Sequence, residues 1–146
     1  MKKPLLISAC LLGLACRYDG KSKPLDASLL DALRRRWRLV PVCPEQLGGL
    51  ATPRAPSERQ GDRVVSRAGR DVTEQYRRGA EQACFLCDLF GCENALLKER
   101  SPSCGSGEVY DGSFSGTLTP GDGVTAAALK ARGVRVYGES QIDALL

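Results

Sequence analysis

Three short apolar runs in this sequence each lead into a cysteine, and this feature most constrains the fold. Runs of this length that stop at Gly, Pro or Ser are typical of buried strands followed by turns. The three pairs of run and cysteine are residues 5–9 with Cys10, residues 39–42 with Cys43, and residues 95–97 with Cys104, the last in a Ser-Pro-Ser-Cys-Gly turn. The cysteines are therefore expected where three strands end.

Helical patterns alternate with these runs. Residues 24–37 place leucines at helical spacing, with Asp26 or Ser28 as the cap and arginines on the outer face. A second helix is expected from a cap at Asp71 to about Phe90, ending at Gly91. A short helix at residues 124–132, a fourth apolar run at 134–137 and a last helical turn at 141–146 follow.

Alternation of strand and helix predicts an α/β fold, with a small parallel sheet and helices on both faces in a Rossmann-like, three-layer arrangement. Two long segments rich in glycine, residues 44–61 and 105–123, are expected to be loops, and residues 63–66 a short strand. We find no repeat and no linker, so residues 1–146 are expected to form a single domain.

The composition of the chain excludes several kinds of site and of cellular location. No apolar stretch approaches the ~18 residues that a membrane helix needs, and no cleavage site follows the lysines at the start, so we expect a cytoplasmic protein without a membrane partner. Seven cysteines in a reducing compartment favour metal binding or catalysis over disulfides. The chain has no histidine, which excludes histidine-based triads and zinc sites that use histidine.

In parallel sheets ligands bind beyond the carboxyl ends of the strands, so Cys10, Cys43 and Cys104 are expected to converge there. Dispersed thiols without paired Cys-x-x-Cys motifs suit an iron–sulfur cluster better than zinc. Three ligands for four irons would leave one iron open as a Lewis acid. The alternative is that these cysteines are buried apolar residues, which is common for free cysteine.

Two side chains near these cysteines are candidate catalytic residues. Glu45 follows Cys43 by two positions and can activate water, while Ser101 precedes Cys104 by three and can deliver a proton. In the alternative interpretation Glu45 is an ordinary carboxylate at a helix start and Ser101 a turn residue.

The remaining cysteines are interpreted differently. Cys84, Cys87 and Cys92 accompany a helical pattern and are expected in the core, although a second cluster or a reversible disulfide stays open. Cys16 shares a loop with Cys10, and the sequence leaves its role open, a spare thiol near the site being one interpretation. The arginines at 34–36 and 77–78 are interpreted as solvated helix faces rather than as a nucleic-acid surface.

Blocks along nearly the whole chain resemble a bacterial family long catalogued as a domain of unknown function, whose characterised members are thiouracil desulfidases. The blocks, specific in order and spacing, are residues 7–13, 16–20, 41–45, 48–50, 53–54, 69, 71–73, 97–105, 110–112 and 121–125. The three cysteines Cys84, Cys87 and Cys92 are not a feature that we associate with this family.

The resemblance implies a [4Fe-4S] cluster held by Cys10, Cys43 and Cys104, with Glu45 and Ser101 as catalytic residues. It implies replacement of C=S by C=O in a thiolated pyrimidine, with sulfide released and no net redox change. We expect a monomer acting on a small molecule. Two alternatives stay open: a cluster enzyme for another small molecule, and an iron–sulfur or zinc module with a role connected to nucleic acid.

Overall fold

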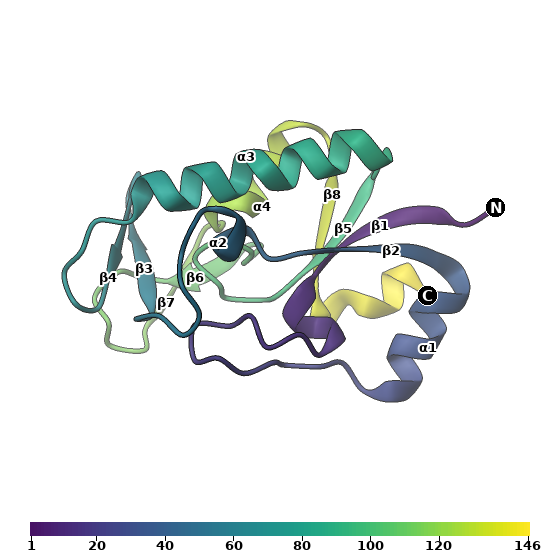
Figure 1. Cartoon of the computed structure of the whole chain (residues 1–146), viewed down its shortest axis with the longest axis horizontal. Helices are drawn as coiled ribbons and strands as arrows, with labels where there is room; N and C mark the ends of the chain where they lie inside the picture. Colours follow the sequence, from purple (N-terminus) through teal and green to yellow (C-terminus); the bar gives the residue numbers. More distant parts are fainter.

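Four parallel strands form the central sheet of the protein, whose computed structural model describes residues 1–146 (Figure 1). The strands lie in the order β2-β1-β5-β8, and every neighbouring pair is parallel. Their bounds are Lys3–Ser8 for β1, Trp37–Val42 for β2, Asn94–Leu97 for β5 and Arg135–Gly138 for β8. The predicted parallel sheet is thus confirmed.

Helices cover both faces of this sheet (Figure 1). One face packs against α3 (Thr73–Phe90) and α4 (Val124–Ala131), the other against α1 (Ala27–Arg36) and the 3₁₀ helix η2 (Glu139–Leu145). Successive residues of a strand point to opposite faces. On β1, Leu6 accordingly enters the core beneath α3 and α4, while Leu5 and Ile7 enter the core beneath α1. The three-layer α/β architecture expected from the sequence is correct.

The long segments predicted as loops contain short elements, and this part of the prediction was wrong. Residues 44–61 hold helix α2 (Pro44–Leu47) and strand β3 (Ser57–Gln60), which pairs with β4 (Arg63–Ser66). Residues 105–123 hold the hairpin of β6 (Glu108–Tyr110) and β7 (Leu118–Pro120). The Glu58 carboxylate ties the hairpins together by accepting hydrogen bonds from the amides of Gly112 and Phe114. Strands this short are held by contacts with distant residues, so they show no hydrophobic periodicity in the sequence.

Several boundaries also differ. β1 ends at Ser8, so Cys10 lies on the 3₁₀ helix η1 (Ala9–Leu12) rather than on the strand. α1 begins three residues later than predicted, and the Asp26 carboxylate accepts a hydrogen bond from the Ser28 hydroxyl instead of capping the helix. The predicted end of α3 at Gly91 is confirmed, with the left-handed backbone (φ 68°) that glycine favours.

Helix α2 lies directly on α3 because two glycines stand where they meet, Gly79 in α3 and Gly48 at the C-terminal end of α2. A Cβ atom on Gly79 would stand 2.0 Å from the Pro44 carbonyl oxygen, and one on Gly48 would stand 1.9 Å from the Gln75 carbonyl oxygen. No side chain fits at these positions. The close packing fixes α2, and with it the residues at its start, against a long rigid helix.

None of the helices combines the length and the apolar character required to cross a membrane.

Candidate active site

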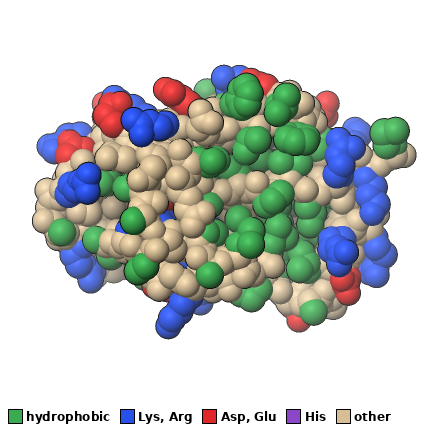
Figure 2. Space-filling model, viewed as in Figure 1, with side chains coloured by type: hydrophobic (Ala, Val, Ile, Leu, Met, Phe, Trp, Pro, Cys, Tyr) green, Lys and Arg blue, Asp and Glu red, His purple; other side chains and the backbone are tan.

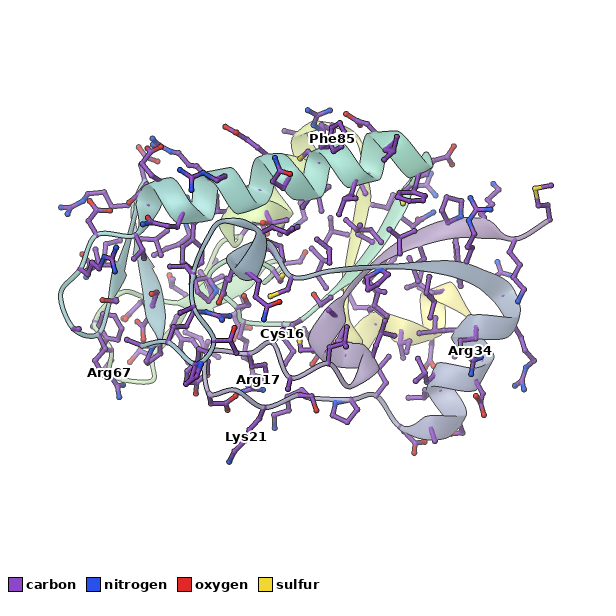
Figure 3. The ribbon with its side chains drawn as sticks, in the orientation of Figure 1. Cys16, Arg17, Lys21, Arg34, Arg67 and Phe85 are labelled. Atoms are coloured by element: carbon purple, nitrogen blue, oxygen red, sulfur yellow. The ribbon has the colours of Figure 1, made fainter.

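A cavity of about 730 Å³ opens where β1, β2 and β5 end. All five side chains singled out from the sequence, Cys10, Cys43, Glu45, Ser101 and Cys104, line this cavity. They come from three separate parts of the chain that the parallel sheet brings to one edge. The predicted convergence of the strand-end cysteines is therefore observed. Figure 3 marks the place by Cys16, a buried residue that lines the cavity.

The three strand-end thiols are each held by the element that follows the strand. Cys10 lies on η1, and its carbonyl oxygen accepts hydrogen bonds from the amides of Gly13 and Lys23, which folds the first loop around it. Cys43 is the residue before α2, whose first residue is Pro44. Cys104 lies in the turn after β5. Cys10 and Cys104 are buried and Cys43 is partly exposed.

The electrostatics of these thiols show how closely they are grouped. Burial, and then the charge of Cys43, raises the pKa of Cys10 to about 11 and that of Cys16 to about 12. Burial also raises the pKa of Cys104, and the charges of Glu45, Cys10 and Cys43 add to that effect. Deprotonation of one thiol thus disfavours deprotonation of the next. A positively charged group among the thiols would offset this repulsion.

The donor set fits an iron–sulfur cluster. In a cluster each thiolate binds a different iron, so its ligands stand apart. Lys98 and Arg17 lie close enough to lower the pKa of Cys10, and they supply positive charge opposite the thiols. The Arg17 Nε atom is buried and has no hydrogen-bond partner in the protein.

Glu45, the second residue of α2, is held by an ion pair that sequence reasoning did not anticipate. The Arg54 guanidinium donates to its Oε2 atom from Nε at 2.8 Å and from Nη2 at 2.5 Å. The Arg54 side chain is only 8% exposed and the Glu45 side chain 14%. Pro53-Arg54 is one of the family-like blocks of the sequence, but no periodicity links residue 54 to residue 45.

The Ser101 hydroxyl oxygen accepts two hydrogen bonds, from the amides of Ser103 at 3.1 Å and Cys104 at 3.0 Å. A hydroxyl has two acceptor lone pairs and one proton. With both lone pairs used, the proton is free to be donated into the cavity. Ser101 is therefore a turn residue, as the alternative interpretation held, and its side chain also lines the cavity.

Tyr76 is a second neighbour of Glu45 that sequence reasoning missed. It is buried on α3, and its hydroxyl lies near the Glu45 carboxylate and the Ser57 hydroxyl. Burial, reinforced by the charge of Glu45, raises the pKa of Tyr76, so the phenol stays protonated and acts as a donor. Tyr76 lies among the apolar residues of α3, so the sequence pattern predicts only a core position for it.

The remaining cysteines lie as predicted. Cys84, Cys87 and Cys92 are all buried in the core beneath α3, away from the cavity, and the Cys87 thiol donates to the Cys92 carbonyl oxygen at 3.2 Å. Cys16 lines the cavity beside Cys43, whose thiol lies 3.7 Å from the Cys16 carbonyl oxygen. Cys16 therefore lies at the site, and its role stays open.

The exposed arginines at the end of α1 lie far from this cavity. Basic side chains gather at the end of the molecule where the N-terminus and α1 meet (Figure 2), and Arg34 stands there, well away from Cys16 (Figure 3). Arginines in the last turn of a helix offset the partial negative charge of that helix end. Their position is consistent with a solvated helix face.

A family model described as 2-thiouracil desulfurase matches residues 5–141. The chain belongs to the 2-thiouracil desulfurase family. It is 40% identical over 152 aligned positions to the uncharacterized protein YbbK of Bacillus subtilis (strain 168), covering 97% of this chain and 99% of that protein. A solved structure, the [4Fe-4S]-dependent thiouracil desulfidase TudS, superposes with a TM-score of 0.94 at 50% identity, covering 99% of this chain and 95% of the other. The family resemblance inferred from the sequence is confirmed.

Proposed function

We propose that this protein is an iron–sulfur enzyme that removes sulfur from thiolated pyrimidines, converting thiouracil to uracil and sulfide without net redox change. We further propose that Cys10, Cys43 and Cys104 hold a [4Fe-4S] cluster, with Glu45 and Ser101 as catalytic residues. The observation that carries the proposal is the meeting of these five side chains in one cavity of a chain from this family. The similarity to TudS supports the same cofactor.

The reaction exchanges one sulfur for one oxygen: a C=S group and water give C=O and hydrogen sulfide. When bound, the cluster supplies an iron without a protein thiolate, a Lewis acid suited to a soft substrate sulfur. Glu45 takes a proton from the attacking water and releases it to solvent once sulfide has left. Ser101 donates its free hydroxyl proton to the ring or to the departing sulfur and regains it from solvent. No electron enters or leaves, so no further redox partner is required.

The size of the cavity supports this assignment. Sites for small molecules usually enclose roughly 300–1,000 Å³, and about 730 Å³ lies within that range. Such a space can hold both a cluster and a pyrimidine ring. The residues that form its walls lie between Ser8 and Gly116, and the central sheet also includes β8 near the end of the chain, so we propose that residues 1–146 act as one domain. We also propose that the protein works as a monomer in the cytoplasm and needs no nucleic-acid partner.

Anaerobic purification tests the proposal. We expect brown protein with about four irons per chain and release of sulfide from 2-thiouracil or 4-thiouracil. Alanine variants of Cys10, Cys43 and Cys104 should each lose iron, whereas Cys87→Ala, a buried cysteine away from the cavity, is the matched control that keeps it. Brown protein that releases no sulfide would support the cluster but would show that thiouracil is not the substrate. Colourless protein that resists reconstitution would overturn the whole proposal.

A further inference from the structure

Arg54 makes more contacts at the cavity wall than an ion pair with Glu45 requires. Besides the two bonds to Glu45 Oε2, its Nη1 atom donates to the Ala51 carbonyl oxygen and to the Thr52 hydroxyl, and its Nη2 atom donates to the Cys16 carbonyl oxygen. Its own amide donates to the Tyr18 carbonyl oxygen at 2.8 Å. The guanidinium is thereby fixed by acceptors from the first loop and from the segment after α2.

We propose that Arg54 is a positioning residue for the desulfuration reaction, holding Glu45 by Oε2 so that Oε1 is presented as the oxygen that takes the proton from water. Both bonds from Arg54 end on Oε2, which leaves Oε1 without a contact to Arg54. A guanidinium is planar and rigid, so fixing its other donors also fixes the direction of the carboxylate. This inference rests on the proposed function, in which Glu45 is the base.

The surroundings of Glu45 explain why its carboxylate has to be held in one orientation. Glu45 lies near the Cys104 thiol, so negative charge on the thiolates, or on a cluster that they hold, would repel its carboxylate. The Tyr76 hydroxyl on α3 faces it from another side. A free glutamate side chain has several rotamers, and a displacement of about 1 Å of a reacting group can lower the rate about 100-fold. Arg54 opposes the repulsion and selects one orientation.

The decisive variants are Arg54→Ala and Arg54→Lys, compared as cluster-loaded enzymes. We expect Arg54→Ala to lower kcat about 100-fold with KM nearly unchanged and with the cluster absorbance intact. Arg54→Lys keeps the charge but not the two-donor fork, so its kcat should fall between those of Arg54→Ala and the wild type. Added guanidinium ion should restore part of the rate of Arg54→Ala, and an ammonium salt at equal concentration should restore less.

The matched control is Arg63→Ala. Arg63 donates to Asp71 Oδ2 from Nε at 3.2 Å and from Nη2 at 3.0 Å, the same arrangement at an exposed place outside the cavity. This variant should keep kcat, KM and cluster content. Wild-type kcat in Arg54→Ala, a rise in KM alone, or a loss explained by missing cluster would each overturn the positioning role.

Crystal structures separate this inference from the proposed function, because they need no turnover. In the wild type we expect one orientation of the Glu45 carboxylate, bonded through Oε2, and in Arg54→Ala a displaced or spread side chain. An unmoved Glu45 in the variant would overturn the inference even if sulfide release is confirmed. Wild-type protein that holds its cluster but releases no sulfide would instead refute the proposed function, while the crystallographic comparison would still decide whether Arg54 orients Glu45.

Discussion

The Cys104 amide donates a hydrogen bond to the Ser101 hydroxyl at 3.0 Å, so one side chain both shapes the turn that carries Cys104 and lines the cavity. The Ser103 amide adds a second bond to the same oxygen. The same hydroxyl group thus has a structural role in the turn and, in the proposed reaction, a chemical role as proton donor. A change at this position has to be analysed for both effects.

Replacing Ser101 by alanine should lower the rate of sulfide release about 100-fold or more through loss of the proton donor. It should also lower the free energy of unfolding by about 1–2 kcal/mol, because two amides of the turn lose their acceptor. Steady-state assays and urea unfolding measure the two effects separately. Ser101→Thr keeps the hydroxyl and should retain most of both.

Ser103→Ala is the control for this prediction. The Ser103 hydroxyl is buried and lies 2.8 Å from the Thr125 hydroxyl, outside the cavity lining. The variant should lose stability of a similar size while keeping the rate. If Ser101→Ala proves as active as the wild type, Ser101 is a turn residue alone.

A double variant, Cys84→Ala with Cys87→Ala, should keep both iron content and turnover. The two thiols are buried in the core beneath α3 and do not line the cavity. Burial raises the pKa of Cys84, and raises that of Cys87 to about 12, so neither is a ready nucleophile near neutral pH. We expect only a loss of stability, about 1 kcal/mol per site, seen in thermal unfolding. Loss of activity would instead indicate thiol redox chemistry or a second cluster.

Much of the site could be predicted because its residues follow strands that carry a strong local signal. Runs such as Leu5-Leu6-Ile7 are buried on both faces, and a parallel sheet necessarily brings the ends of its strands to one edge. The positions of Cys10, Cys43 and Cys104 follow from these two facts.

The parts that could not be predicted depend on contacts between distant residues. Tyr76 approaches the Glu45 carboxylate from α3 only because α2 packs on α3, and Arg54 meets the same carboxylate because the segment after α2 turns back towards it. The two hairpins pair over very short strands and are linked through Glu58. None of these contacts leaves a period or a spacing in the chain. They are set by tertiary packing, which a single sequence does not display.

Gly79→Ala should disturb the site from a distance. The new Cβ atom would overlap the Pro44 carbonyl oxygen, forcing α2 away from α3 and moving Cys43 and Glu45 with it. We expect a loss of about 1–3 kcal/mol in the free energy of unfolding, together with lower iron content and lower kcat. Iron analysis, urea unfolding and sulfide release are measured on the same preparation.

The matched control for Gly79 is Gly91→Ala at the end of α3. A Cβ atom there meets nothing within 4 Å, and the only cost is the left-handed backbone, about 1–2 kcal/mol. This variant should lose stability without losing iron or activity. If both glycine variants keep a normal site, the close approach of α2 to α3 is not what positions Glu45.

Asp71 should make the stability of the protein depend on acid pH. Hydrogen bonds from the Thr73 hydroxyl and amide, with further help from Arg63, lower the pKa of Asp71 to about 2. In the unfolded chain the pKa of an aspartate is about 3.9. The folded state therefore gains stability from the ionised carboxylate above about pH 4, and that gain is lost as the pH falls from about 4 towards 2.

Asp71→Asn removes this gain, since an amide has no charge to stabilise. Urea unfolding of the wild type and the variant at a series of pH values should give the largest difference in free energy of unfolding between pH 5 and 7, shrinking as the pH falls to about 2. Because Asp71 organises the start of α3, which carries Tyr76 and Gly79, the acid-sensitive contact lies at the base of the helix that supports α2. A difference that stays constant over the whole range would show that the Thr73 hydrogen bonds stabilise the fold equally well with a neutral side chain.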